Sequence, residues 1–126
     1  MNKCPFCAIA PDKFVAQNHH TFTVRDTLPI SPGHTLIVPK RHIASIFEAT
    51  SQEVAALWDA LQQSRTQLLK EFSADGYNIG INDGLVAGQT ILHLHIHLIP
   101  RYDGDMPDPR GGIRWIFPDK AVYWKD

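Results

Sequence analysis

The feature that most constrains this chain is the segment at residues 92–98, in which apolar residues and histidines alternate. Side chains on a β-strand point to opposite faces with a period of two, so the pattern predicts a strand over residues 90–99. One face would carry Leu92, Leu94, Ile96 and Leu98. The other would carry the histidine row, His93, His95 and His97, spaced ~6.8 Å apart. Three imidazoles on a common face indicate a polar site that opens into a cleft.

Three interpretations of the histidine row compete. Histidines on a solvated sheet face are the plainest, although chance seldom places three at alternate positions in an apolar run. Metal binding is the second, but the row spans ~13 Å, so one ion would take a pair of these histidines at most without ligands from elsewhere. No carboxylate lies between the histidines, as a binuclear hydrolase would need. The third is nucleophilic catalysis, in which one imidazole attacks phosphorus while its neighbours donate to the phosphoryl oxygens.

The other patterns predict an α+β protein. Aromatic and β-branched residues at 14–17 and 21–25 predict a hairpin, and residues 34–38 predict a strand that ends at Pro39. Thr50 and Glu53 form a capping box before an apolar pattern of helical period, which continues to Gly76 and places Trp58 on the core face. Alternation at residues 77–81 predicts one more strand. Residues 8–10 predict a turn or short helix that ends at Pro11.

Length and charge limit the possible partners. The chain has 126 residues with 12 Lys plus Arg against 13 Asp plus Glu, which predicts a single domain over residues 1–126, with its core at 4–101 and a tail at 102–126. Balanced charge argues against nucleic acid or an anionic membrane as the partner. No apolar run reaches the ~18 residues of a membrane helix, so we expect a cytoplasmic protein. The tail keeps Trp115, Phe117 and Trp124, and we expect it to pack on the domain or on a second subunit.

The two cysteines, Cys4 and Cys7, are three positions apart and admit three interpretations. A glutaredoxin-like redox site would need a preceding strand, and only three residues come before Cys4. The second interpretation is a pair of thiols that bind no metal. The third is a structural zinc site, for which Cys-x-x-Cys supplies half of a tetrahedral set. His42 and His93 are then the best candidates for the other two ligands.

The histidine row and its surroundings resemble the signature of the histidine triad family. The matching segments are Gly88-Gln89-Thr90 before the row, Pro100-Arg101 after it, Asn82-Asp83-Gly84 in the preceding loop and Ser31-Pro32-Gly33-His34 upstream. The resemblance covers residues 4–101. It implies a mainly antiparallel sheet of about five strands with one long helix and a short N-terminal helix, and usually a homodimer.

The resemblance also implies a role for individual residues. His95 would be the nucleophile, His97 would donate to a non-bridging phosphate oxygen, and His34 would support the row from the adjoining strand. Gln89 and Thr90 would lie near the leaving group. Asp26 would accept from the ribose hydroxyls, Phe6, Ile9 and Val24 would enclose the base, and Asn82 would lie beside the phosphate. Some members hold zinc through such a cysteine pair, which makes His93 a structural ligand beside Cys4, Cys7 and His42.

These roles predict a nucleotide hydrolase or transferase that acts at the α-phosphorus of a nucleoside phosphoramidate or a dinucleoside polyphosphate. His95 would form a nucleotidyl-histidine intermediate, and water would release the nucleoside monophosphate. A purine nucleotide containing AMP is the expected partner, and zinc is expected as a structural ion that the chemistry does not require. Two alternatives stay open: a nucleotide-binding adaptor with vestigial activity, and a zinc or redox protein that uses the histidines as ligands.

Overall fold

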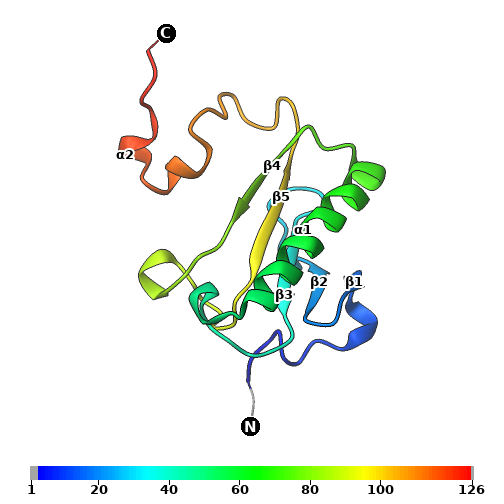
Figure 1. Ribbon diagram of the computed structural model, residues 1–126. Helices are drawn as coiled ribbons and strands as arrows, with labels where there is room; N and C mark the ends of the chain where they lie inside the picture. The colour runs from blue at the N-terminus through cyan, green and yellow to red at the C-terminus, as the bar shows by residue number, and fades with distance from the viewer. Residues whose placement is uncertain (1–2, 126) are drawn as a thin grey trace.

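The computed structural model describes residues 3–125 and shows a five-stranded antiparallel sheet with one long helix against it (Figure 1). The order of the strands across the sheet is β1-β2-β3-β5-β4. Their bounds are Ala16–Gln17 for β1, Thr21–Arg25 for β2, Thr35–Pro39 for β3, Gly76–Gly80 for β4 and Ile96–Arg101 for β5. The predicted α+β class, the hairpin at β1 and β2 and the sheet of about five strands are therefore confirmed. Residues 1–2 and 126 of the predicted domain lie outside the described part.

Helix α1, Ser51–Phe72, begins at the predicted capping box. The Thr50 side chain accepts a hydrogen bond from the Glu53 backbone N–H, and the Glu53 carboxylate accepts one from the Thr50 N–H. Leu57, Leu61 and Leu68 are buried against the sheet. The prediction that Trp58 lies on the core face is wrong, because its side chain is 57% exposed. Its position is one residue past Leu57, which already turns it toward the flank of the helix.

The sheet has a different cover on each face. On one face, α1 packs over Ile37, Ile96 and Leu98. On the other face, a second cluster contains Phe6, Phe22, Val24, Leu36 and Val38, so the N-terminal segment covers the strands of the hairpin. This segment makes a turn at residues 5–8 and continues into a 3-10 helix, η1, at Pro11–Lys13. Pro11 therefore begins a short helix, where we predicted that it would end one.

Strand β5 differs from the predicted strand at residues 90–99, because it begins at Ile96 and ends at Arg101. Its side chains alternate as expected, with Ile96 and Leu98 buried beneath α1 and His97 on the opposite face. The segment at 91–95 leaves the sheet, although the backbone N–H of Leu94 still donates to the Ile43 carbonyl at 2.7 Å. Leu92 is 51% exposed and does not join the apolar face. The histidine row is therefore divided between a strand and a loop.

Two further strand ends differ slightly from the predictions. Strand β3 begins at Thr35 and includes Pro39, and β4 ends at Gly80. Before β3, Gly33 has φ +87°, and a Cβ there would lie 3.0 Å from side-chain atoms of Leu68 and Phe72. A glycine at this position lets the loop approach α1 closely and brings His34 to the end of β3.

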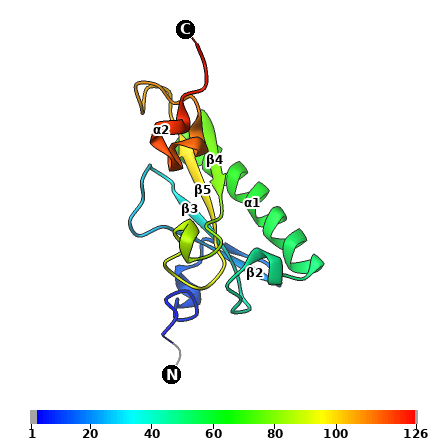
Figure 2. The same ribbon diagram turned by 90° about the vertical axis from the view of Figure 1, so that its left-hand side faces the viewer.

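The C-terminal tail contains a 3-10 helix, η4, at Gly112–Ile116 and a short helix, α2, at Pro118–Ala121. Figure 2 shows the tail on the opposite side of the sheet from α1, next to the end of β4. The Tyr102 hydroxyl donates to the Pro32 carbonyl at 2.6 Å and holds the start of the tail. The tail packs on the sheet only in part, because Ile116, Phe117 and Tyr123 are each about 70% exposed. No helix in residues 3–125 is both long and apolar enough to cross a bilayer.

Candidate active site and metal site

A pocket of about 1490 Å³ opens on the face of the sheet that α1 does not cover. It draws side chains from β2, β3, β4 and β5, from the N-terminal segment and from the tail. The predicted site residues that line it are Phe6, Ile9, Val24, Asp26, His34, Asn82, Thr90, His95 and His97. The fold therefore brings together nine predicted residues that are spread over more than ninety positions of the chain.

His34 and His97 are joined by a hydrogen bond of 2.9 Å between His34 Nε2 and His97 Nδ1. The backbone N–H of Ile30 donates to His34 Nδ1 at 3.2 Å, so we assign the His34 proton to Nε2. That proton is donated to His97 Nδ1, which leaves the His97 proton on Nε2. Asp26 Oδ2 lies 3.5 Å from His34 Nε2 at the side of this pair. The arrangement turns His97 into a hydrogen-bond donor at its Nε2 atom.

Burial favours the neutral form of both imidazoles. It lowers the pKa of His34, against the raising effect of the Asp26 carboxylate. It also lowers the pKa of His97, and the neighbouring rings of His95 and His34 lower it further. A neutral pair is what the assigned protons require, because a second proton on His34 would remove the acceptor that Ile30 uses.

The orientation of His95 depends on the backbone of His93. His95 Nδ1 lies 2.9 Å from the His93 carbonyl oxygen, so Nδ1 carries the proton and donates it there. The lone pair of the neutral ring is then on Nε2. The ring packs against Phe6, with centroids 4.9 Å apart, and against His97, with centroids 5.1 Å apart. His95 therefore has a fixed ring with one nucleophilic nitrogen in the pocket wall.

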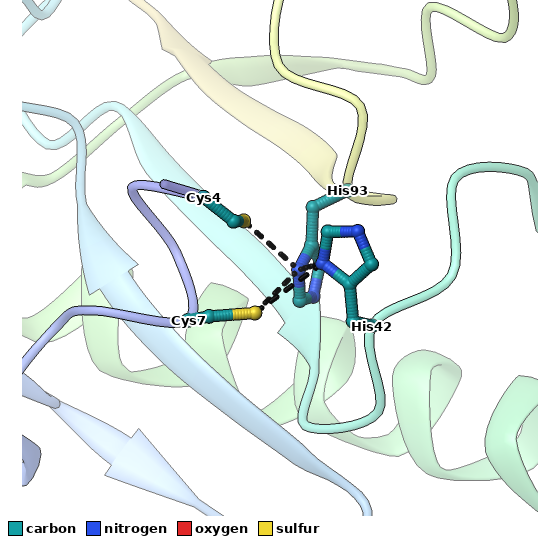
Figure 3. Close-up of side chains that lie close together, drawn as sticks. All are labelled: Cys4, Cys7, His42 and His93. Carbon is teal, nitrogen blue, oxygen red and sulfur yellow. Dashed lines mark hydrogen bonds between the residues drawn. The ribbon is translucent and has the colours of Figure 1, made fainter. Parts of the chain in front are cut away.

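His93 does not share the pocket with the other two members of the row. It is fully buried and lies beside Cys4, Cys7 and His42 (Figure 3). The expectation that all three imidazoles project into one cleft is thus wrong. The reason is the departure of residues 91–95 from the sheet, which turns His93 toward the N-terminal segment.

The four side chains form a possible zinc site, because their ligand atoms lie within 4.8 Å of one another. Cys4 Sγ lies 3.4 Å and Cys7 Sγ 3.5 Å from His93 Nδ1, Cys7 Sγ lies 3.3 Å from His42 Nδ1, and the two Nδ1 atoms are 3.0 Å apart. Tetrahedral zinc, with bonds of ~2.3 Å to sulfur and ~2.0 Å to nitrogen, spaces sulfur and nitrogen ligands ~3.5 Å apart and two nitrogens ~3.3 Å apart. The observed spacing fits these values.

The position of the proton on the His93 ring is also the one that a metal ligand requires. His93 Nε2 lies 2.8 Å from the Pro39 carbonyl oxygen and donates to it, so the lone pair is on Nδ1 and points at the cysteines. Burial lowers the pKa of His93 and opposes protonation of that nitrogen. The glutaredoxin-like interpretation has less support, because the residues after Cys4 form a turn and not the first turn of an α-helix.

The remaining predicted residues lie in the loop between β4 and β5. Gln89 is buried and does not line the pocket: its Oε1 accepts from the Gly84 N–H, and its Nε2 donates to the Ala44 carbonyl. Asp83 accepts from the Ser45 hydroxyl and the Ile46 N–H, which ties the loop to the segment before α1. Thr90 and Asn82 are exposed at the rim of the pocket.

The sequence patterns missed one wall of the pocket. Gly80 on β4 and the tail residues Ile113, Trp115 and Ile116 line it. The backbone groups that fix the ring protons, at Ile30, Pro39 and His93, were also missed. No pattern marks a backbone group that becomes a partner only when distant segments meet.

A comparison with known protein families finds that residues 8–104 match the model of the HIT domain. The chain belongs to the HIT family. This confirms the resemblance to the histidine triad proteins, and the match ends at residue 104, just after the tail begins at residue 102.

Individual relatives and solved structures agree with this membership. An uncharacterised HIT-like protein of Methanocaldococcus jannaschii is 40% identical to the chain over 106 residues, which are 81% of each protein. A bis(5'-nucleosyl)-tetraphosphatase of Schizosaccharomyces pombe is 40% identical over 80 residues, which are 64% of this chain and 44% of that protein. The crystal structure of a zinc-bound histidine triad family protein from Mycobacterium smegmatis has 34% identity and a TM-score of 0.74, with 84% of each chain covered.

Proposed function

We propose that this HIT protein is a nucleotide hydrolase or transferase that uses His95 to attack the α-phosphorus of a nucleoside phosphoramidate or a dinucleoside polyphosphate. The observation that carries the proposal is the bond from His95 Nδ1 to the His93 carbonyl. It leaves the Nε2 lone pair in the pocket, on a ring beside His97, whose own Nε2 carries a proton. The name of the tetraphosphatase relative in S. pombe supports the substrate class.

The proposed reaction has two steps. In the first, His95 Nε2 forms a bond to phosphorus, and the bond from phosphorus to the leaving group breaks with its electron pair going to the leaving group, which takes a proton from water when it is an amine. The His97 Nε2–H donates to a non-bridging oxygen of the phosphoryl group. In the second, water attacks phosphorus, the bond to Nε2 breaks, a proton passes to solvent, and the nucleoside monophosphate leaves. His95 is then unchanged.

We propose a place in the pocket for each part of a mononucleotide. Phe6, Ile9 and Val24 provide an apolar surface for a base, for which we propose a purine. Asp26 is only half buried and its carboxylate can accept from ribose hydroxyls. Thr90 at the rim would contact the leaving group, and Asn82 would contact the phosphate. Gln89 would act on this loop through its bonds to Gly84 and Ala44.

We propose that Cys4, Cys7, His42 and His93 hold a structural zinc ion. With zinc bound, these four residues would cross-link the N-terminal segment to the segments before α1 and β5, and the proposed phosphoryl chemistry would not require the ion. His93 serves both sites, because its side chain would be a ligand while its carbonyl orients His95.

The central experiment replaces His95 by Ala and measures turnover of adenosine phosphoramidate and of diadenosine tetraphosphate. We expect turnover to fall by more than ~1000-fold, because the nucleophile is lost, while AMP still binds. His19→Ala, at an exposed histidine in the β1–β2 turn, is the matched control. Mass spectrometry of wild-type protein quenched with substrate should place an added AMP on His95. Undiminished turnover in His95→Ala would refute the assignment, and AMP binding without turnover in the wild type would favour a nucleotide-binding adaptor.

Three broader proposals accompany this function. We propose that the chain acts as one domain, as a homodimer and in the cytoplasm. The exposed apolar side chains of the tail support the dimer, since a second subunit would cover them. A cysteine pair that would hold zinc through its thiolates supports a reducing compartment. Light scattering after size-exclusion chromatography measures the subunit number, and a monomer at micromolar concentration would remove the dimer.

A further inference from the structure

We propose that Cys4 and Cys7 form an oxidative modification site, at which a peroxide converts the two thiolates into a disulfide and thereby releases the His95 ring from its fixed orientation. The cysteine pair is the target of the oxidant here and catalyses no thiol exchange on other proteins. Only the expected effect on turnover rests on the proposed function, because the oxidation itself needs no nucleotide.

The turn at residues 5–8 holds the two cysteines at a spacing suited to a disulfide. The backbone N–H of Ala8 donates to the Cys4 carbonyl at 3.2 Å. Residues three positions apart across such a turn have Cα atoms within ~7 Å of each other, and a disulfide needs ~4.4–6.8 Å. Both sulfurs lie beside the same nitrogen, His93 Nδ1, at 3.4 and 3.5 Å (Figure 3). Rotation of the two side chains therefore brings the sulfurs together.

An oxidant has access to both sulfurs. Cys7 is exposed and Cys4 is half-buried. A cavity of about 280 Å³, lined in part by Cys4, His42 and Thr90, opens beside the cysteine turn. A water molecule occupies ~30 Å³ in the liquid, so this space also admits hydrogen peroxide. Cysteines that hold zinc are thiolates, which is the form that reacts with a peroxide.

The oxidation has two steps. In the first, the Cys7 thiolate attacks an oxygen of hydrogen peroxide: a sulfur–oxygen bond forms, the oxygen–oxygen bond breaks, and the leaving hydroxide takes a proton to give water. In the second, the Cys4 thiolate attacks Cys7 Sγ: the sulfur–sulfur bond forms, the sulfur–oxygen bond breaks, and a second hydroxide takes a proton. The sulfurs lose two electrons and the peroxide gains them. Two thiolates, one peroxide and two protons give one disulfide and two waters.

The disulfide removes half of the proposed zinc ligands. Zinc binds cysteine as the thiolate, and a structural site needs four ligands, so His42 and His93 alone would not retain the ion. His93 keeps the hydrogen bond from its Nε2 to the Pro39 carbonyl but loses the ion that would hold its Nδ1. The segment at 91–95 is then less firmly held.

Two contacts carry this change to His95. Its Nδ1 donates to the His93 carbonyl at 2.9 Å. Phe6 lies between the two cysteines in the chain and is buried, and its ring packs against both His93 and His95, with centroids 5.7 and 4.9 Å apart. Loosening of His93 or of the cysteine turn therefore frees the His95 ring, and its Nε2 no longer has a fixed direction.

The first test treats the full chain, loaded with zinc, with a molar excess of hydrogen peroxide. We expect both thiols to disappear, the mass of the denatured chain to fall by two hydrogen atoms, and about one zinc ion per chain to reach a chromogenic chelator. In Cys4→Ser the second step cannot occur, so dimedone should label a sulfenic acid at Cys7. Cys7→Ser is the matched control, and its half-buried Cys4 should label more slowly. Thiols that stay reduced, or a disulfide between two chains, would overturn the inference.

The second test follows His95 and turnover. The ¹⁵N chemical shifts of His95 should show the Nδ1–H tautomer before oxidation and a tautomer mixture after it, and kcat/KM for adenosine phosphoramidate should fall at least tenfold. Dithiothreitol with added zinc should restore both. This reversal distinguishes the disulfide from oxidation of Met106, which also lines the active-site pocket and whose sulfoxide needs a reductase enzyme for repair.

The outcomes separate this inference from the proposed function. Unchanged ¹⁵N shifts of His95 after the disulfide has formed, or a loss of turnover that dithiothreitol and zinc do not reverse, would overturn the inference and leave the proposed function intact. Absence of turnover before any oxidation would remove the proposed function. The thiol, zinc and ¹⁵N measurements would then still decide whether the modification site exists and reaches His95.

Discussion

Three of the imidazoles described above, those of His34, His93 and His95, each have one ring nitrogen bonded to a backbone group. Ile30 N–H donates to His34 Nδ1, His95 Nδ1 donates to the His93 carbonyl, and His93 Nε2 donates to the Pro39 carbonyl. In every case the backbone bond decides which nitrogen is left for chemistry. A neutral imidazole has one donor and one acceptor, so fixing one nitrogen fixes the other.

The first prediction concerns His34, which acts through His97 as a positioning residue. In His34→Ala, His97 Nδ1 loses its donor, and we expect kcat to fall about 10- to 100-fold with a smaller change in KM. The decisive readout is the ¹⁵N chemical shifts of His97, which should show the Nε2–H tautomer in the wild type and a tautomer mixture in the variant. Unchanged shifts would show that His34 only fills space. Comparison with His20→Ala, at a histidine in the β1–β2 turn, controls for the loss of a ring.

At the scale of elements, the start of α1 has a carboxylate of unusual acidity. The Arg41 guanidinium and the Thr50 N–H hold the pKa of Glu53 at about 2, below its ordinary value of 4.5. The folded state therefore favours the ionised form. Its contribution to the free energy of unfolding is complete above pH 4.5 and is lost as pH falls toward 2.

We predict that Glu53→Gln lowers the free energy of unfolding at pH 7 by about 1 kcal/mol, because Arg41 is half exposed and its ion pair is partly screened. The difference from the wild type should shrink below pH 4.5 and be nearly absent at pH 2, as measured by urea unfolding. Glu71→Gln, which breaks the exposed pair with Arg25, is the control and should change stability by less than ~0.5 kcal/mol. A constant difference from pH 7 to pH 2 would contradict the assigned cause.

The segment at 91–95 is the element that joins the metal site to the nucleophile. We predict about one zinc ion per chain in protein purified without chelator, and for Cys4→Ser a melting temperature lower by more than ~5 °C. Turnover should also fall about tenfold, since the His93 carbonyl that orients His95 would lose its anchor. His19→Ala should change none of these values. Absence of zinc from the wild type would remove the proposed metal site. Full turnover in Cys4→Ser would show that the metal site does not support the orientation of His95.

Some features of the fold could be predicted from the sequence, and others, including the path of the segment at 91–95, could not. Helix α1 and the hairpin were predictable because a capping box and alternation are local signals, and the alternating faces of His97 and Leu98 followed from the strand period. The start of β5 at Ile96 was not, because it goes with contacts between His93 and the distant residues Cys4, Cys7 and His42. The exposed position of Trp58 and the tail wall of the pocket likewise depend on which distant segments meet.

At the scale of the whole molecule, the parts of the proposed substrate are distributed over separate strands. The proposed ribose contact, Asp26, follows β2, the proposed phosphate contact, His97, lies on β5, and Gly80 on β4 lines the far end of the pocket. Three strand spacings of ~4.8 Å put the outer two of these elements ~14 Å apart. Residues more than ~10 Å apart with no shared partner contribute independently to a binding free energy.

We therefore expect recognition to be modular, with the ribose contact at Asp26 and the β4 end of the pocket contributing independently to kcat/KM. Asp26→Asn should weaken discrimination against 2'-deoxyadenosine substrates by the same factor whether residue 80 is glycine or leucine. The double variant Asp26→Asn/Gly80→Leu should show the product of the two single effects on kcat/KM, and a clear departure from that product would mean that the two ends communicate. If they do not, selection on β4 and the tail alone could retune this scaffold to new departing groups while its nucleoside preference is inherited unchanged.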